Sequence, residues 1–297
     1  IFFIYFIASS SGFGILVGAH RLWCHRSFKA HWSLRLLLMV FQTLALQNDI
    51  YEWSRDHRVH HKFSETDADP HNSKRGFFFA HMGWLMCKKH PEVFRKGKSI
   101  DLSDLWSDPI VRFQRKLYIP LVILIWGLLP TLIPYYFWQE HIITAFALNM
   151  LRYSVTLHST WLVNSAAHMW GSKPYDKNIE PRENYSVNYL TYGEGYHNYH
   201  HTFPFDYSAS ELGWTGNFNL ATAFIDFFAL IGLVYDRKTV SKDIVMKRHE
   251  RTGEKPIKYR NGKSFLTDLF IGIVIATWPL WFLFGTKFLI QHTNVQL

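Results

Sequence analysis

Cysteine is scarce in this chain, and several common motifs are absent. The 297 residues contain two cysteines, Cys24 and Cys87, which excludes a disulfide-stapled scaffold and is typical of a reducing compartment. The two lack C-x-x-C spacing, so we interpret them as ordinary thiols rather than zinc ligands. No signal peptide and no nucleic-acid-binding motif is visible, so the net charge of +9 does not indicate nucleic acid as a partner.

Lysine and arginine are almost absent from three long apolar stretches. Of the 32 basic residues, Arg152 and Lys287 alone fall within them. Because about 20 apolar residues can span a bilayer, we predict four membrane spans, at residues 1–19, 117–138, 141–164 and 265–291. Two shorter apolar segments, 33–46 and 220–235, are more typical of helices lying in the membrane interface. The alternative is a buried pair of helices in a soluble protein.

The other basic residues lie in two blocks, 20–116 and 165–264. Because positive charge concentrates on cytoplasmic loops, we expect both blocks on the cytosolic side and both termini in the lumen. The predicted fold is therefore a single all-α integral membrane domain over residues 1–297, with four transmembrane helices and a cytosolic helical cap. Such a basic cap suits anionic headgroups of the lipid bilayer or a phosphate-bearing substrate.

Histidine is abundant, and eight of the 17 histidines form three clusters within the cytosolic blocks. The second and third clusters share the spacing H-x-x-H-H. In a helix, residues i, i+3 and i+4 lie on one face, close enough to share a metal ion. Imidazole suits iron, zinc and copper, and a site built almost wholly of histidine favours redox chemistry. The clusters are His20 and His25; His57, His60 and His61; and His197, His200 and His201.

Five segments carry a resemblance to a known family. They are H-R-L-W-C-H (20–25), N-D-I-Y-E-W-S-R-D-H-R-V-H-H-K-F (48–63), D-P-H-N-S-K-R-G-F-F-F (69–79), W-L-V-N-S-A-A-H (161–168) and G-E-G-Y-H-N-Y-H-H-T-F-P (193–204). In this order, over about residues 12–252, the chain resembles membrane acyl-CoA desaturases of the stearoyl-CoA, delta-9 type. The resemblance implies an enzyme of the endoplasmic reticulum membrane that introduces a cis double bond into a fatty acyl-CoA. It would use O2, two iron ions and electrons from cytochrome b5 and its reductase; the position of the double bond, delta-9 or delta-11, stays open.

The resemblance also implies a ligand set for two iron ions, although zinc could replace iron as an artefact of expression. Asn164 precedes His168 by four residues and would reach the second iron through water. Among the remaining histidines, His71 is the one we expect to support a ligand, because a ligating imidazole usually needs a partner on its other nitrogen. One iron would be held by His20, His25, His57, His61 and His200, and the other by His60, His168, His197 and His201.

Substrate residues follow from the same resemblance. A group near the second cluster would bind the CoA moiety, and a second group would bend the acyl chain next to the metals, so that geometry selects the bond that reacts. At Lys88 the family can carry arginine, and lysine lacks the bidentate fork. The expected substrate-binding residues are Asn48, Arg55, Asp56, Lys88, Lys89, Trp161 and Asn261, and the expected kink residues are Gln47, Trp53 and Thr160.

The order of the segments departs from the family. The chain opens close to what would be the second span, whereas residues 254–291 resemble the start of a family member, with Arg260-Asn261 just before an apolar run. We hypothesise a circular permutation with its new termini in the luminal loop. The alternative is a truncated N-terminus followed by an unrelated helix. No H-P-G-G stretch of a fused cytochrome occurs, so we expect an external electron donor.

Two other functions are compatible with the histidine clusters. A membrane hydroxylase of fatty acyl or alkyl chains uses similar clusters, and its products would be hydroxy-acyl chains instead of alkenes. A metal-binding transporter or scaffold is the alternative of another class, and it predicts ligands along a pore inside the spans.

Overall fold

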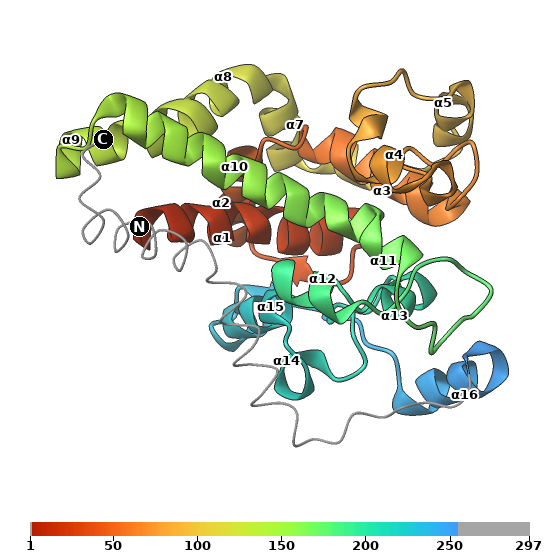
Figure 1. Ribbon diagram of the computed structural model, residues 1–297. Coiled ribbons are helices and arrows are strands. Elements are labelled where there is room, and N and C mark those ends of the chain that lie inside the picture. Colours follow the sequence, from red (N-terminus) through yellow and green to blue (C-terminus); the bar gives the residue numbers. More distant parts are fainter. Residues whose placement is uncertain (1, 255–297) are drawn as a thin grey trace, which may run out of the picture.

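The computed structural model describes residues 2–254, which form a predominantly helical protein (Figure 1). The predicted span 265–291, Asn261 and the hypothesised permutation lie outside the described residues. The α-helices are α1 (Phe2–Phe13), α2 (Trp32–Ala45), α3 (Ile50–Phe63), α4 (Phe77–His81), α5 (Pro91–Gly97), α6 (Ser103–Ser107), α7 (Pro109–Lys116), α8 (Tyr118–Val122), α9 (Leu129–Trp138), α10 (Ile142–Asn164), α11 (Ala166–Met169), α12 (Tyr185–Leu190), α13 (His197–Thr202), α14 (Gly213–Gly216), α15 (Leu220–Leu230) and α16 (Lys242–Thr252). The π-helical segments are η1 (Gly14–Cys24) and η4 (Ile123–Leu128), the 3-10 turns are η2 (Ser73–Arg75) and η3 (Gly83–Leu85), and the strands are β1 (Lys29–Ala30) and β2 (Val234–Tyr235).

Two helical stretches within residues 2–254 are long and apolar enough to cross a membrane. They are Phe2–Cys24, formed by α1 and η1, and Tyr118–Trp138, formed by α8, η4 and α9. Helix α10 has 23 residues but is not among them. It carries a buried arginine, Arg152, whose guanidinium donates to the backbone oxygen of Leu44 (3.0 Å) and to Oδ1 of Asn149 (2.7 Å). Two of the predicted spans thus have the required length and composition, and the four-span arrangement stays a prediction.

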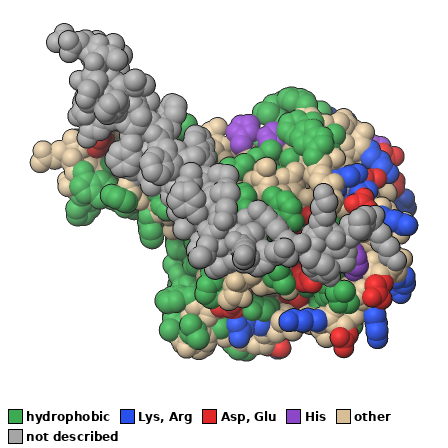
Figure 2. Space-filling model, turned by 60° about the horizontal axis from the view of Figure 1, so that its bottom comes forward, with side chains coloured by type: hydrophobic (Ala, Val, Ile, Leu, Met, Phe, Trp, Pro, Cys, Tyr) green, Lys and Arg blue, Asp and Glu red, His purple; other side chains and the backbone are tan. Residues whose placement is uncertain are grey.

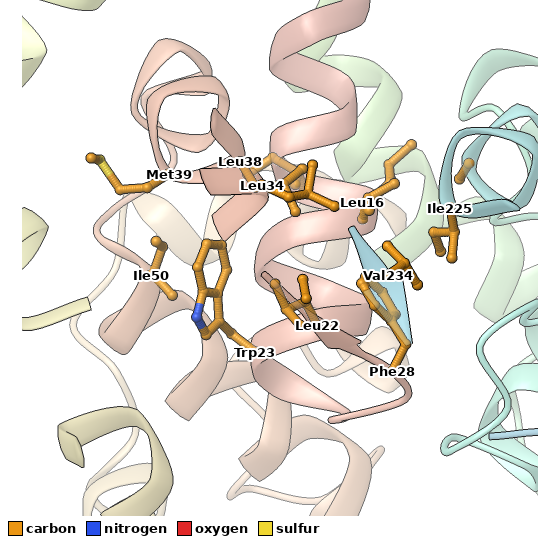
Figure 3. Close-up of a cluster of buried hydrophobic side chains, with 14 of the residues drawn as sticks. Leu16, Leu22, Trp23, Phe28, Leu34, Leu38, Met39, Ile50, Ile225 and Val234 are labelled. Atoms are coloured by element: carbon orange, nitrogen blue, oxygen red, sulfur yellow. The ribbon is translucent and has the colours of Figure 1, made fainter. Parts of the chain in front are cut away.

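The main hydrophobic core lies where η1 packs against α2 and α15 (Figure 3). Trp23 of η1 is buried beside Leu34 and Leu38 of α2, and Ile225 of α15 belongs to the same cluster. Burying one such side chain contributes about 1.5–3 kcal/mol. The indole Nε1 of Trp23 also donates to Oδ2 of Asp108 (3.1 Å), so the polar atom at the core's edge is satisfied.

A two-stranded antiparallel ribbon departs from the all-α prediction. Strand β1 pairs with β2, with Lys29 opposite Tyr235 and Ala30 opposite Val234. The prediction of one helix over 220–235 is therefore wrong at its end: α15 stops at Leu230, and the chain turns at Gly232 with a φ of 78° before it extends. Positive φ is favourable for glycine. The ribbon ties the segment after the first histidine cluster to the C-terminal part of the chain.

The long helix α10 lies across α1 and α2 (Figure 1), and its C-terminal end meets α4, α11 and α12. Helices α3 and α13, which carry the two H-x-x-H-H sequences, lie near this end. Figure 2 shows hydrophobic side chains over its left part and most lysine and arginine side chains on the right and lower edge. Charged side chains on this face therefore gather mainly on one side, and hydrophobic side chains also lie at the upper right of the view.

Candidate metal centre

The second histidine cluster lies in the last two turns of α3. Asp49 caps the start of this helix, because its Oδ1 accepts the backbone N–H of Glu52 (2.9 Å). Arg58 anchors the helix to η1 by donating to the backbone oxygens of Trp23 (2.8 Å) and Cys24 (3.0 Å). Helical spacing therefore turns His57, His60 and His61 in one direction, toward η1 and α13.

The first cluster owes its geometry to π-helical winding. Residues five apart lie on different faces of an α-helix, but hydrogen bonds from residue i to i+5 in a π-helix stack them. The His25 N–H donates to the His20 oxygen (3.0 Å), and the two ring centroids lie 4.8 Å apart. His20 thus lies inside the helix, beyond the predicted span end at residue 19. No pattern in the sequence indicated this winding.

The third cluster lies on the short helix α13, which buried polar side chains hold in place. Oε1 of Glu183 accepts the backbone N–H of Tyr199 (2.8 Å). The Asn198 amide donates to the backbone oxygens of Asp176 and Pro181 (both 2.9 Å). Helix α11 follows α10 directly and turns the buried His168 toward this helix.

The nine imidazoles form two groups whose members' ligand nitrogens all lie within 4.8 Å of one another. In the first group, His20 Nε2 lies 2.9 Å from His200 Nε2, and His61 Nε2 lies 3.2 Å from the same atom. The groups adjoin, because the rings of His61 and His201 stack at 4.0 Å. Group 1 consists of His20, His25, His57, His61 and His200, and group 2 of His60, His168, His197 and His201. Each group contains the residues that the resemblance implied for one ion.

Three carboxylates lie behind the ligand rings, and the sequence analysis did not predict them. His20 Nδ1 lies 2.9 Å from Glu194, and His60 Nδ1 lies 2.9 Å from Asp69. His168 Nδ1 lies 2.6 Å from Oε1 of Glu65. A carboxylate accepts, so each Nδ1 donates and each Nε2 keeps its lone pair for a metal. The acidic residues of G-E-G-Y-H and D-P-H could have been found by asking which partner each ligating imidazole needs.

The G-E-G sequence explains how Glu194 reaches His20. Gly193 has a φ of 125°, and a Cβ atom at Gly195 would lie 2.3 Å from the backbone oxygen of Asn184. Only glycine fits such a turn and so close an approach. Buried Arg21 donates to Oε1 of Glu194 from Nη2 (2.5 Å). Burial alone would raise the pKa of Glu194, but Arg21 and His20 hold it at about 2.

The electrostatics keep most of these imidazoles neutral. Burial and the neighbouring rings hold the pKa values of His25, His57, His61, His197, His200 and His201 well below the usual range. Burial also lowers the pKa of His168, although Glu65 opposes it. Burial would lower the pKa of His60 as well, but Asp69 outweighs it and raises that pKa. Neutral imidazole is the form that binds a metal ion.

The nitrogen contacts of group 1 cannot all be hydrogen bonds. His57, His61, His200 and His20 form a row of Nε2 atoms 3.1, 3.2 and 2.9 Å apart. His20 can only accept, since its Nδ1 donates to Glu194. Nε2 of His200 would then donate its hydrogen to His20, and the same nitrogen would have no lone pair left to accept a hydrogen bond from His61. A cation at the centre of the row resolves the conflict.

The donor sets are compatible with one metal ion in each group. Five imidazoles in group 1 exceed the four ligands of a tetrahedral zinc site. Nitrogens about 2.1 Å from one ion lie about 3.0 Å apart at right angles and about 3.4 Å apart in a tetrahedron. The contacts of 2.9, 2.9 and 3.1 Å are nearer to the right-angled arrangement, and the two contacts of 3.2 Å lie midway between the two arrangements.

A cavity of about 300 Å³ reaches both groups. Its walls include His20 and His57 of group 1 and His197 of group 2, together with Asn164 at the end of α10. The lining also includes these residues singled out in the sequence: Gln47, Asn48, Trp53, Asp56, His71, Thr160 and Trp161. Nε2 of Gln47 donates to Oγ1 of Thr160 (3.1 Å), which joins the loop after α2 to α10 at the cavity. The volume is typical of a small-molecule site.

The three basic residues expected to bind the CoA moiety, Arg55, Lys88 and Lys89, are not among the residues that line this cavity. We call these three residues the basic mouth. Arg55 donates to Oδ1 of Asp56 from Nε (3.0 Å) and to Glu52 (3.1 Å), and Lys89 also pairs with Asp56. Lys88 is exposed. Both lysines line a second cavity of about 360 Å³, which shares Trp84 with the first.

Two of the other described histidines have partners outside the two groups. His81 contacts His158 (2.9 Å) and Ser165 (3.0 Å), and His90 caps α5. His71 lines the first cavity with its ring against that of His60. The hydrogen-bond partner of His60 Nδ1 is Asp69, and the backbone N–H of His71 donates to Oδ1 of this carboxylate (3.1 Å), so a direct supporting role for the His71 ring stays a prediction.

The fold and the centre define a class: a helical protein with membrane-length apolar helices and two buried histidine groups that open on one cavity. Comparison with known proteins gives the family. The profile of the fatty acid desaturase family matches residues 1–214. An acyl-CoA Delta-9 desaturase of Acheta domesticus is 60% identical over 245 residues, covering 82% of this chain and 68% of the relative. The stearoyl-CoA desaturase of Homo sapiens is 56% identical over 261 residues, covering 88% and 71%. The chain belongs to the fatty acid desaturase family.

Proposed function

We propose that this chain is an acyl-CoA desaturase, an oxidoreductase that introduces a cis double bond into a saturated fatty acyl-CoA. The observation that carries this proposal is the cavity, which joins ligands of both histidine groups to the residues expected to bend an acyl chain. The relatives named above are acyl-CoA desaturases and support the same substrate class.

Two irons would supply the oxidising power needed to remove hydrogen from an unactivated methylene group, using O2. Group 1 would hold one ion and group 2 the other, with Asn164 near the second through water. Glu194, Asp69 and Glu65 orient three of the rings by fixing the proton on Nδ1. Overall, a –CH2–CH2– unit, O2, two electrons and two protons give –CH=CH– and two waters.

The protein's part in selectivity is to position the acyl chain. Gln47 and Thr160 close one side of the cavity through their hydrogen bond, and Trp53 lies next to His57, with ring centroids 4.8 Å apart. A chain that bends between them presents one C–C bond to the metals, so position decides which bond reacts. We propose delta-9 selectivity, with delta-11 as the alternative.

The CoA moiety would lie toward the basic mouth. Asn48 is exposed, and Asp56 lines the same cavity while it pairs with Arg55 and Lys89. The phosphates would attract Lys88 and Lys89 and compete with Asp56 for Lys89. Trp161 would contact the acyl-CoA within the cavity. Asn261 completes the proposed substrate set, outside the described residues.

We place the enzyme in the endoplasmic reticulum membrane, with its histidine clusters facing the cytosol. The apolar stretches Phe2–Cys24 and Tyr118–Trp138 support a membrane location. The proposed electron donors are cytochrome b5 and its reductase. The basic residues of blocks 20–116 and 165–264 would suit an acidic donor surface.

Expression in cells that lack their own acyl-CoA desaturase tests the proposal. We expect restored unsaturated lipids, with the double bond mapped by mass spectrometry at carbon 9, and no restoration by a His60→Ala variant. Hydroxy-acyl products would show a hydroxylase instead. Metal uptake by vesicles without any new lipid would favour a transporter.

A further inference from the structure

The two histidine groups differ in the charge behind their ligand rings. Group 2 has four imidazoles, and two of them donate to separate carboxylates, Asp69 and Glu65. Group 1 has five imidazoles, and the carboxylate found behind them is Glu194, which His20 shares with Arg21. Group 1 thus has more imidazoles than group 2 but fewer carboxylates behind them.

Arg21 is built into its position next to Glu194. Its side chain is 1% exposed. Its Nη1 donates to Oγ1 of Thr222 (2.8 Å) and to the backbone oxygen of Tyr207 (3.0 Å), while Nε and Nη2 donate to Glu194 (3.2 and 2.5 Å). A guanidinium stays charged when buried, so Glu194 and Arg21 add no net charge behind group 1.

Asp69 and Glu65 have no such partner. Among residues 2–254, neither carboxylate forms a salt bridge with lysine or arginine. Asp69 instead accepts the backbone N–H groups of Glu65 (2.9 Å) and His71 (3.1 Å), and Glu65 accepts from Ser73 Oγ (3.3 Å). Both accepting carboxylates and all three donors belong to buried residues, and charges in such surroundings interact more strongly than in water.

We propose that this arrangement makes the two metal sites electronically unequal, with the group 2 ion at the lower reduction potential. The inference rests on the proposed di-iron function. Going from the divalent to the trivalent state, each ion loses one electron, and nearby negative charge stabilises the more positive state. Asp69 and Glu65 therefore favour the oxidised ion in group 2, whereas Arg21 cancels the same effect of Glu194 in group 1. Arg21, Asp69 and Glu65 act through the ligand rings as positioning residues.

A reductive titration of the iron-loaded protein, followed by Mössbauer spectroscopy with redox mediators, tests this inference. We expect two one-electron steps. Glu65→Gln should raise the lower-potential step by about tenfold in the ratio of reduced to oxidised ion, which is about 59 mV for one electron. Arg21→Gln should lower the upper step, and Arg21→Lys should restore it. Glu92→Gln, at a half-buried position of α5 outside both groups, is the matched control and should move neither step.

Three results would count against the inference, and they are distinguishable. A wild-type protein that binds two irons of equal potential would overturn the inference alone. So would a Glu65→Gln variant that shifts the upper step, because the sites would then be assigned the wrong way round. A protein that binds fewer than two irons would overturn the di-iron function, and the inference with it. Asp69→Asn provides the same test as Glu65→Gln if that variant does not fold.

Discussion

The histidine centre and the basic mouth differ in how firmly their side chains are held. The nine imidazoles are buried or half-buried on helices, and three of them are oriented by buried carboxylates. In the mouth, Lys88 is exposed, and the side chains of Arg55 and Lys89 are 25% and 23% exposed. The centre is organised before any substrate binds, whereas the mouth can rearrange around one.

This difference predicts unequal costs of mutation. A metal site depends on every ligand having its geometry fixed in advance. A charge at a solvated surface contributes little, because water screens it and the side chain must be ordered. The predictions below run from the largest expected effect, in the centre, to the smallest.

The largest effect is expected for His60→Ala. The variant should lose desaturation and retain less than two irons per chain, because His60 is a member of group 2 and buried Asp69 would lose its hydrogen-bond donor. Product analysis and elemental analysis of the purified protein measure both quantities. His90→Ala, which removes an exposed cap of α5, is the control. Full activity and full iron content in His60→Ala would remove this residue from the centre.

Asp69→Asn should cost less, about 10–100-fold in iron affinity or activity. The asparagine keeps the size of the side chain but lacks the negative charge that supports His60. Iron affinity is measured by competition with a chelator of known strength. The control is Asp67→Asn, two residues away and exposed. Equal affinities for the two variants would show that the carboxylate behind His60 is unimportant.

Lys88→Ala should change the mouth without changing the centre. We expect the KM for acyl-CoA to rise about two- to fivefold at low salt and less at high salt, with kcat unchanged. Steady-state kinetics at two ionic strengths check this, with Lys62→Ala on α3 as an exposed control. A fall in kcat as large as that of Asp69→Asn would break the comparison between the two regions.

The smallest effect concerns the support of α13 and depends on pH. Burial raises the pKa of Glu183 to about 8 from an ordinary value of 4.5. Because the folded pKa is raised, the contribution of Glu183 to stability is fully present below pH 4.5 and is lost as the pH rises to 8.

Thermal unfolding in detergent at pH 6 and pH 9 measures this loss. Glu183→Gln keeps the acceptor for the Tyr199 N–H but cannot ionise, so its unfolding temperature should fall less than that of the wild type over this interval. Glu180→Gln, at a more exposed site, should behave as the wild type does. Identical pH dependence in all three proteins would contradict the raised pKa.

The sequence by itself determined the local features of the centre. The spacing of His57, His60 and His61 matches the period of an α-helix, so these rings share a face whatever the rest of the chain does. Long apolar stretches indicated membrane-length helices, and two of them have that length and composition. The division of the ligands between two ions came from the resemblance to a family, and spacing alone did not provide it.

The tertiary structure decided what depends on contacts between distant residues. The π-winding that aligns His20 with His25 and the ribbon that ends α15 follow from packing, which no local pattern records. The pairing of His20 with His200, 180 residues apart, and the carboxylates behind three rings exist only in the folded chain. Periodicity is a property of neighbouring residues, whereas charge balance at a buried centre is the sum of side chains that folding brings together.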